Sequence, residues 1–386
     1  MTDLAAATAL LARLVSFDTT SARPNLALID WARAWLEEQG IASRVLLDPA
    51  SGKANLHAVI GPAVAGGIAL SGHVDCVPVE GQAWSGDPFT LRQESGRLIG
   101  RGATDMKGFV ACMLAMAPAF RDRGLARPIH LCLTFDEETT MAGAPLLVER
   151  LADGMPPPAM AIVGEPTGMG AVIGHKGYAS WDGWVSGVTG HSSRPDRTLN
   201  ALEMAAEAVV WLRGAARRLR ESGPRHEGFE PPFSTVHVGT FNAGSVLNIV
   251  PDRADFTFEM RYIPGEDPEA LLGELSAHLE RLCAEPTPSG RHARFGFGRR
   301  SHAPALDLPE GHALAGLVKR LAGRNDAARV SYGTEAGFFA RAGIPAIVCG
   351  PGDIREAHQP DEWIAESEIA ACLAFLHRLA DTLAQD

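Results

Sequence analysis

The chain has 386 residues, which at ordinary domain sizes is enough for two or three domains. Hydrophobic residues make up 46% of the sequence and charged residues 21%, and this balance excludes wholesale disorder. The formal net charge of −11 argues against proteins that wrap nucleic acid or dock on an anionic membrane. No run of about 18 uninterrupted apolar residues occurs, so no transmembrane helix is expected.

The N-terminal segment, Met1 to Val15, carries apolar residues at helical spacing and lacks the basic start of a signal peptide. We therefore expect a first surface helix. The six cysteines include no CxxC pair, and three of them lie in apolar runs typical of core elements. A disulfide framework is not expected in so long a chain, and this cysteine usage fits a reducing cytoplasm.

The first 178 residues alternate segments typical of strands and helices. Apolar runs that predict strands cover 67–71, 128–135 and 159–163, and a helical pattern covers 106–120. Such alternation predicts an α/β domain, in which helices flank a mostly parallel mixed sheet.

The pattern changes after residue 178, and we expect an inserted domain over 179–297. Its predicted strands lie at 178–188, 234–241, 253–262 and 292–297, and its predicted helices at 199–220 and 268–284. This β-α-β-β-α-β order is that of a ferredoxin-like α+β sandwich. The α/β pattern then returns, with a helix at 311–322, a strand at 345–349 and a final helix at 366–384. The first domain is therefore predicted to be discontinuous, comprising 1–178 and 298–386.

Polar side chains follow the predicted strands of the α/β domain, and they are His73, Asp75, Glu137, Glu138, Glu165 and His358. In an open α/β sheet, ligands bind outside the carboxyl ends of the strands. A single loop histidine or Glu-Glu pair is usually solvated. Several such residues at equivalent places predict a site.

The spacing of these residues suits metal chemistry. An imidazole that binds a metal needs its other N–H held by a carboxylate or carbonyl, and Asp75 points to the same side as His73 along an extended chain. Glu137 and Glu138 point apart in an extended segment, so one can bind metal while the other acts as a general base. Asp105, in a loop that opens a helix, offers an oxygen able to bridge two ions.

Six short motifs together resemble the zinc aminoacylase/carboxypeptidase family of metallohydrolases. They are Gly72–Asp75 (GHVD), Gly102–Gly108 (GATDMKG), Asp136–Glu138 (DEE), Gly164–Thr167 (GEPT), Gly190–Ser193 (GHSS) and Asn248–Pro251 (NIVP). The family includes acetylornithine deacetylases, succinyl-diaminopimelate desuccinylases and dipeptidases. The resemblance runs from about residue 4 to 380, and the ordered set is highly specific. It implies a di-zinc exopeptidase-like catalytic domain, an inserted lid and dimerisation domain, and a homodimer.

The resemblance also implies a role for each polar residue. The implied metal ligands are His73, Asp105, Glu138, Glu165 and His358, with Asp105 bridging two ions. Asp75 is expected to orient His73, and Glu137 to act as the general base. Two Zn²⁺, three ligand carboxylates and a bridging hydroxide sum to zero charge, which a partly buried site tolerates. Oxygen and nitrogen ligands without cysteine favour Zn²⁺, and Co²⁺ or Mn²⁺ can substitute.

The expected reaction is the hydrolysis of an amide by a metal-activated water. Glu137 would take the proton of this water and pass it to the leaving amine. By resemblance, His191 is an oxyanion donor, often across the dimer, and Asn248 and Arg261 contact substrate. Independently, the planar guanidinium of Arg261 suits a substrate carboxylate. In the alternative interpretation, Arg261 is a surface residue and Asn248 a turn residue.

The C-terminal part resembles the acetylornithine deacetylase branch of the family. This likeness is carried by Tyr332–Gly337 (YGTEAG), Cys349–Gly352 (CGPG) and Ala357–Glu362 (AHQPDE). Gly333, Thr334 and Glu335 are accordingly expected to bind substrate, and the Glu335 carboxylate to pair with the side-chain ammonium of ornithine. Alternatively, Glu335 caps the following helix.

The sequence thus predicts a metal-dependent amide hydrolase for a small-molecule N-acyl amino acid. The first expectation is an acetylornithine deacetylase of arginine biosynthesis, and the alternative is a succinyl-diaminopimelate desuccinylase or aminoacylase. A non-catalytic binding protein and a thiol enzyme using Cys76 are less favoured. Trp181 and Trp184 depart from the family pattern, which leaves the exact substrate open. A basic run is expected to be a solvated helix face, and it comprises Arg213, Arg217, Arg218 and Arg220.

Overall fold

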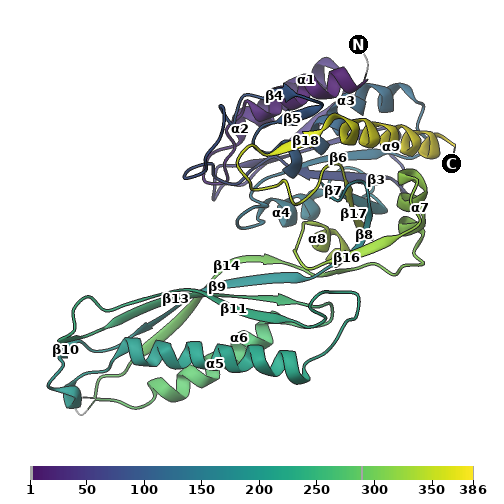
Figure 1. The fold of residues 1–386 in the computed structure, drawn as a ribbon. Coiled ribbons are helices and arrows are strands. Elements are labelled where there is room, and N and C mark those ends of the chain that lie inside the picture. Colours follow the sequence, from purple (N-terminus) through teal and green to yellow (C-terminus); the bar gives the residue numbers. More distant parts are fainter. Residues whose placement is uncertain (1–2, 288–289, 386) are drawn as a thin grey trace. The chain divides into compact units, whose positions relative to one another are not determined.

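The computed structural model describes residues 3–287 and 290–385, which pack as two compact units (Figure 1). The first unit comprises Met1–Gly174, Leu306–Arg329 and Thr334–Asp386, and the second comprises His175–Ala305 and Val330–Gly333. The second unit therefore interrupts the first along the sequence. Among the described residues, no helix is long and apolar enough to cross a membrane.

The first unit is built on a mixed sheet with the strand order β1-β2-β6-β3-β7-β17-β8-β15, and β16 pairs with β8. Its strands are β1 (Ser43–Leu47), β2 (Ala54–Ile60), β3 (Ile68–His73), β6 (Ile129–Thr134), β7 (Met160–Pro166), β8 (Ala171–His175), β15 (Leu306–Asp307), β16 (Ala327–Val330) and β17 (Ala346–Gly350). The central strands β6, β3, β7 and β17 run parallel to one another. All residues of β3, β6 and β17 are buried, as expected of strands covered on both faces.

Helices flank this sheet, which confirms the predicted α/β class. They are α1 (Asp3–Val15), α2 (Leu26–Glu38), α3 (Gly108–Asp122), α4 (Gly143–Arg150), α7 (Ala313–Ala322), α8 (Ala336–Arg341) and α9 (Glu366–Ala384). Helices α1, α3 and α9 pack against one another over one face (Figure 1). Helix α1 covers most of the segment where a first helix was predicted, whereas Met1 and Thr2 lie outside the described residues.

A small sheet of the first unit joins two distant segments of the chain. It has the order β18-β5-β4, formed by β4 (Arg92–Glu94), β5 (Arg97–Ile99) and β18 (Trp363–Ala365). The antiparallel pairing of β18 with β5 places Trp363 opposite Ile99. The segment that follows His358 therefore lies beside the segment that precedes Asp105.

The second unit is an antiparallel sheet covered by two helices (Figure 1). Its strands are β9 (Gly177–Ser186), β11 (Thr235–Ala243), β13 (Arg253–Tyr262) and β14 (Arg294–Ala303), in the order β11-β13-β9-β14, and its helices are α5 (Ala201–Ser222) and α6 (Pro268–Cys283). This is the predicted β-α-β-β-α-β arrangement. Asn200 and Asp267 cap the two helices through side-chain oxygens that accept backbone N–H groups. A short ribbon pairs β10 (Gly190–His191) with β12 (Ile249–Val250).

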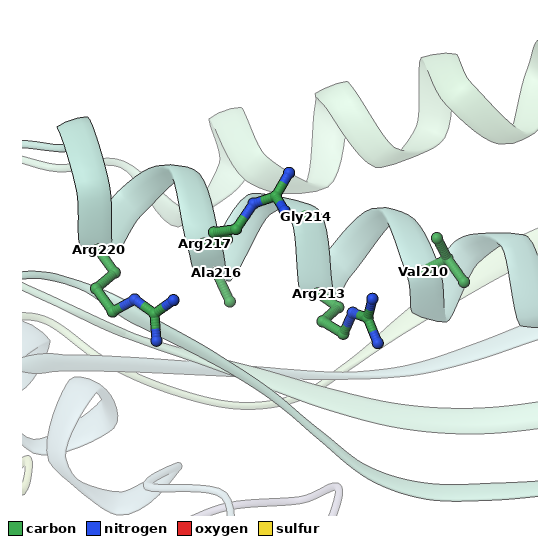
Figure 2. Close-up of a pocket in the computed structure, with 6 residues that line it drawn as sticks. All are labelled: Val210, Arg213, Gly214, Ala216, Arg217 and Arg220. Carbon is green, nitrogen blue, oxygen red and sulfur yellow. The ribbon is translucent and has the colours of Figure 1, made fainter.

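The basic run of α5 lies on its solvent side. The four arginines are exposed, and Arg218 pairs with Glu274 of α6 at 3.3 Å. A shallow groove here is lined by six residues of α5 (Figure 2), which are Val210, Arg213, Gly214, Ala216, Arg217 and Arg220. In Figure 2 the Arg217 guanidinium extends away from those of Arg213 and Arg220. The three charges do not converge on one point, which fits the predicted solvated face.

Candidate metal centre

The fold gathers the predicted ligands at one edge of the first unit's sheet. His73 is the last residue of β3, Glu137 and Glu138 follow β6, and Glu165 lies near the end of β7. These strands are parallel neighbours in the order β6-β3-β7, so their carboxyl ends meet. Asp105 lies in the turn Ala103–Lys107 that leads into α3.

Two groups of side chains could each hold a metal ion, because their ligand atoms lie within 4.8 Å of one another. The first group is His73, Glu137 and Glu165, and the second is His73, Asp105 and Glu138. His358, from the loop between β17 and β18, reaches the second group. Its Nε2 lies 3.0 Å from Glu138 Oε1.

Asp105 lies between the two imidazoles. Its Oδ1 is 2.9 Å from His73 Nε2, and its Oδ2 is 3.3 Å from His358 Nε2. Glu165 Oε1 lies 3.8 Å from the same nitrogen of His73. Each oxygen of the Asp105 carboxylate therefore faces a different histidine, which is the arrangement that a ligand shared between two ions requires.

Asp75 fixes the orientation of His73. The Nδ1 atom of His73 lies 3.0 Å from the main-chain oxygen of Asp75 and 3.5 Å from its Oδ1. Ser21 donates its hydroxyl to Asp75 Oδ2 at 2.7 Å. With Nδ1–H held by these oxygens, Nε2 is the nitrogen that faces Asp105 and Glu165.

The Glu137–Glu138 pair lies in a turn and not, as predicted, in an extended segment. The backbone N–H groups of both residues donate to the Asp75 carboxylate at 3.2 Å. Asp136, with φ of 60°, redirects the chain just before them. The N–H groups of Thr139 and Met141 close the turn locally by donating to the Asp136 main-chain oxygen, and the Asp75 carboxylate, distant in the sequence, holds it in place.

Burial and charge set the pKa values of the cluster. Burial, and then the charge of Glu165, raises the pKa of Glu137 well above its usual value. The pKa of Glu138 is raised to about 7 by burial and by Asp105. The pKa of Asp105 is lowered despite its burial, because His358 and His73 hydrogen-bond to it. Hydrogen bonds to Asp105 and Glu138 raise the pKa of His358 to about 10.

These residues fit divalent metal ions. Four carboxylates crowd around two imidazoles, and an ion can supply the positive charge that protons on the imidazoles otherwise supply. Glu165 Oε1 is buried and has no hydrogen-bond partner among the described residues, so a cation there would satisfy it. Oxygen and nitrogen donors without thiolate suit Zn²⁺, Co²⁺ or Mn²⁺.

Glu335 is fully buried at the start of α8, and its side chain does not cap that helix. Its Oε2 accepts a 2.8 Å hydrogen bond from the Thr134 hydroxyl, whereas Oε1 has no partner within the described part of the chain. Burial raises its pKa to about 7. The buried hydroxyl of Thr334 instead accepts the Ala336 N–H at 3.1 Å. Glu335 thus occupies the N-cap position of α8, but among the described residues its side chain makes no capping hydrogen bond.

The remaining predicted residues belong to the second unit. His191 is exposed on β10, and the Ser192 N–H donates to the Asn248 main-chain oxygen at 3.1 Å, so these two segments lie side by side. The Ser193 N–H donates to His191 Nδ1 at 3.2 Å. The proton of a neutral His191 therefore resides on Nε2, as an oxyanion donor requires.

Arg261 and Gly333 complete the second unit's predicted contacts. Arg261, near the end of β13, stacks 4.8 Å above the Tyr178 ring, and its Nε lies 3.3 Å from Glu259 Oε1. This partly exposed ion pair is a weak interaction that a substrate carboxylate could replace. Gly333 lies close to the Lys176 main-chain oxygen.

Sequence reasoning missed two buried charged residues around the site. Lys53 forms an ion pair with Asp136 and donates to the main-chain oxygen of Ser21. Glu362 lies in a recognised motif but was given no role. Neither residue carries a local signal, because a lysine or glutamate next to an apolar run is usually on the surface. Cys76 is only 1% exposed and burial raises its pKa, which makes it a poor thiolate nucleophile.

Comparison with known proteins identifies the family. The model of Peptidase family M20/M25/M40 matches residues 69–382. This chain belongs to that family. Among its M20 relatives, the acetylornithine deacetylase of Myxococcus xanthus is 39% identical over 381 residues, covering 97% of each chain. The acetylornithine deacetylase of Photorhabdus laumondii is 34% identical and covers 94% of this chain and 92% of its own.

Solved structures of M20 proteins share the fold. The metallo-carboxypeptidase Sso-CP2 of Sulfolobus solfataricus matches with a TM-score of 0.76 at 17% identity, over 97% of this chain and 98% of its own. The Bacillus subtilis YXEP protein, a dinuclear metal-binding M20 peptidase, matches with a TM-score of 0.67 at 16% identity, over 99% of both chains. The comparisons confirm the predicted fold class and the prediction of a metal-dependent amide hydrolase of the acetylornithine deacetylase branch.

Proposed function

We propose that this M20 enzyme is an acetylornithine deacetylase, which converts N2-acetyl-L-ornithine and water to L-ornithine and acetate in arginine biosynthesis. The observation that carries the substrate assignment is the likeness, over 97% of the chain, to an acetylornithine deacetylase. The buried Glu335 carboxylate supports it, because one of its oxygens has no partner in the described residues and is a candidate for the ammonium group of ornithine.

The proposed cofactor is two Zn²⁺ per subunit. His73 and Glu165 would hold one ion, Glu138 and His358 the other, and Asp105 would be shared by both. Bound ions would polarise the amide carbonyl and make the attacking water more acidic. Support comes from the two ligand groups and from the position of Asp105 between the two imidazoles.

Glu137 is the proposed general base. It hydrogen-bonds to neither histidine in the contacts of the described chain, and its raised pKa suits a group that takes a proton and then releases it. Asp75 would keep His73 in the tautomer that presents Nε2. His191 would donate its Nε2–H to the oxyanion, and Asn248, Arg261, Gly333 and Thr334 would contact the substrate.

We also propose that the enzyme works in the cytoplasm as a homodimer. All six cysteines are free and buried, as expected in a reducing compartment. The dimer rests on the family resemblance, in which a histidine at the place of His191 often acts across the dimer, and His191 is exposed. Light scattering of the purified protein measures the oligomeric state, and a monomer would contradict the dimer.

A substrate panel tests the proposed function. Metal content is measured first, and kcat/KM is then determined for N2-acetylornithine, N-succinyl-diaminopimelate and N-acetylmethionine on the same preparation. We expect about two Zn²⁺ per subunit and the highest kcat/KM for acetylornithine. If acetylornithine ranks below both other substrates, the assignment is wrong and the enzyme is a different deacylase of the family.

A further inference from the structure

Two of the proposed metal ligands, Asp105 and His358, lie in segments far apart in the sequence, and a buried carboxylate joins these segments. Glu362 is 1% exposed. Its Oε2 accepts from Arg101 Nη1 at 2.7 Å and from the Gly102 N–H at 3.0 Å. Its Oε1 accepts from the N–H groups of Thr104 at 2.9 Å and Asp105 at 3.1 Å.

These four hydrogen bonds make Glu362 an external cap for the turn that carries Asp105. A carboxylate offers about four acceptor sites, so its capacity is filled. The turn Ala103–Lys107 has no side-chain cap of its own at Gly102. Without Glu362, three backbone N–H groups in a buried place would lack these acceptors, and buried orphan donors are costly.

Arg101 extends the same contact to the segment of His358. Its guanidinium lies 3.4 Å from the Gln359 main-chain oxygen and also hydrogen-bonds to the Gln82 side chain. Gln82 in turn donates its amide to the main-chain oxygen of His358 at 2.9 Å. Arg101 and Glu362 are both almost completely buried, and Arg101 is 0% exposed. The pair therefore contacts the backbone of Asp105, through Glu362, and the backbone next to His358, through Arg101 and Gln359.

The backbone continues this connection on either side. The Gly100 N–H donates to the Glu362 main-chain oxygen at 2.8 Å, and the Thr104 hydroxyl donates to that of Trp363 at 2.9 Å. Next to these contacts, strand β18 pairs with strand β5. By contrast, His73 and Glu165 lie at the ends of β3 and β7, and the main sheet fixes them.

We propose that Glu362, paired with Arg101, is a positioning residue that sets the spacing between Asp105 and His358 and thereby the affinity of the ion that these two side chains share. The inference rests on the proposed metal site, but not on the identity of the substrate. It predicts an unequal effect on the two ions. The ion held by His73 and Glu165 depends on the Glu362 contacts only through the shared Asp105, whereas the other ion depends on them through both Asp105 and His358.

Metal titration of the full-length protein tests this role. The protein is stripped with a chelator, and Co²⁺ binding is followed by calorimetry and by visible absorption. In Glu362→Gln, an amide NH₂ would face N–H donors. We expect one Co²⁺ to bind within about 3-fold of the wild-type affinity and the other to bind about 10–100-fold more weakly, the usual effect of losing a group that orients a ligand. Arg101→Lys keeps the charge, and its affinity for the weakened ion should lie between those of the wild type and of Glu362→Gln.

Two controls separate positioning from general stability. Asp361→Asn neutralises the adjacent carboxylate, which binds Ser85 and Arg92 and makes no contact with residues 102–105 among the hydrogen bonds of the described chain. Val318→Ala opens a cavity in α7 and lowers thermal stability away from the ligands. Both controls should bind two Co²⁺ with wild-type affinities.

Two results would overturn the proposal. One is wild-type affinity for both ions in Glu362→Gln. The other is a loss of Co²⁺ affinity in Val318→Ala as large as that in Glu362→Gln, when the two variants have the same fall in Tm. If Glu362→Gln does not fold, the same titration of Arg101→Lys decides, and unchanged affinities there would also contradict the role. If Glu362→Gln shows the selective metal loss but the fully metallated wild-type protein does not cleave acetylornithine, the proposed substrate is refuted and this inference stays intact.

Discussion

Single carboxylates of the cluster behave differently because their nearest neighbours differ. Asp105 accepts hydrogen bonds from two imidazoles, and its pKa is lowered although it is buried. Glu137 faces Glu165 instead, and burial with this repulsion raises its pKa. These opposite pKa shifts agree with the proposed roles, Asp105 as a ligand shared by two ions and Glu137 as the general base.

Replacing Glu137 separates these roles. Glu137→Gln keeps the shape of the side chain but removes the proton acceptor. We expect kcat to fall at least about 10²-fold, the lower end of what general acid–base catalysis contributes, with unchanged metal content. Steady-state kinetics and elemental analysis on the same sample measure both quantities. Wild-type turnover in the fully metallated variant would remove Glu137 from the mechanism.

Substitution of the single residue Glu335 tests the proposed substrate specificity. If its free oxygen binds the ornithine ammonium, Glu335→Gln should lower kcat/KM for acetylornithine by about 10–100-fold, the range expected for a hydrogen bond to a charged group. Acetylmethionine, which has no side-chain charge, should change less than about 3-fold. Equal losses on the two substrates would show that Glu335 acts only through packing and its hydrogen bond to Thr134.

At the scale of elements, the site depends on how closely neighbouring strands and helices approach. A Cβ atom at Gly164 of β7 would overlap the Phe109 ring of α3, and one at Gly350 of β17 would overlap the main-chain oxygen of Gly164. Glycine at these two positions lets β7 lie tightly between a helix and its parallel neighbour. Glu165 follows Gly164 directly, so this packing also positions a proposed metal ligand.

A substitution on β17 tests the close approach. We expect Gly350→Ala to lower the free energy of unfolding by about 1–3 kcal/mol, the usual cost of overpacking, because the obstructing atom belongs to the backbone. Gly316→Ala in α7 is the matched control, since nothing lies within 4 Å of its added methyl group and alanine favours a helix. Urea unfolding measures both, and equal stabilities of the two variants would contradict the packing argument.

At the scale of the whole molecule, stability is linked to pH through a buried histidine pair. Nε2 of His57 in β2 lies 3.1 Å from Nδ1 of His130 in β6, and Arg44 Nη2 lies 3.0 Å from His57 Nδ1. Burial, and then the neighbouring charges, lowers the pKa of His57 to about 3 and that of His130 to about 4. Both imidazoles thus remain neutral in the fold at pH values where an unfolded chain protonates them.

The sign of the effect follows from linkage. Each folded pKa lies below the unfolded value of about 6.5, so this stability is fully present above pH 6.5 and is lost as pH falls toward 4 and then 3. The slope is at most about 1.4 kcal/mol per pH unit for each histidine. We expect His130→Gln to flatten the dependence of the urea midpoint on pH between 6.5 and 4. An unchanged slope would rule out His130 as a contributor.

Metal removal is the second prediction for the whole molecule. Ions that bind only the folded chain stabilise it by about 4 kcal/mol at a concentration 1,000 times Kd. A chelator should therefore lower Tm by several degrees, and added Zn²⁺ should restore it. Calorimetry of the stripped and reloaded protein measures the change. A Tm unaffected by chelation, with metal loss verified, would argue against the proposed ligand set.

The sequence by itself determined the periodic elements and the ordered motifs. Both helices and three of the four long strands of the second unit were predicted to within two residues, because alternation and helical spacing are local properties. The last strand runs to Ala303 and not, as predicted, to residue 297. The family motifs named His73, Asp105 and His358. Tertiary structure alone decided which distant groups meet. The attachment of the Glu137–Glu138 turn to Asp75, the hydrogen bond of Glu335 to Thr134 and the four donors of Glu362 all join residues 62 or more positions apart. A buried charge has no local signature, since its partner is supplied only when the chain folds.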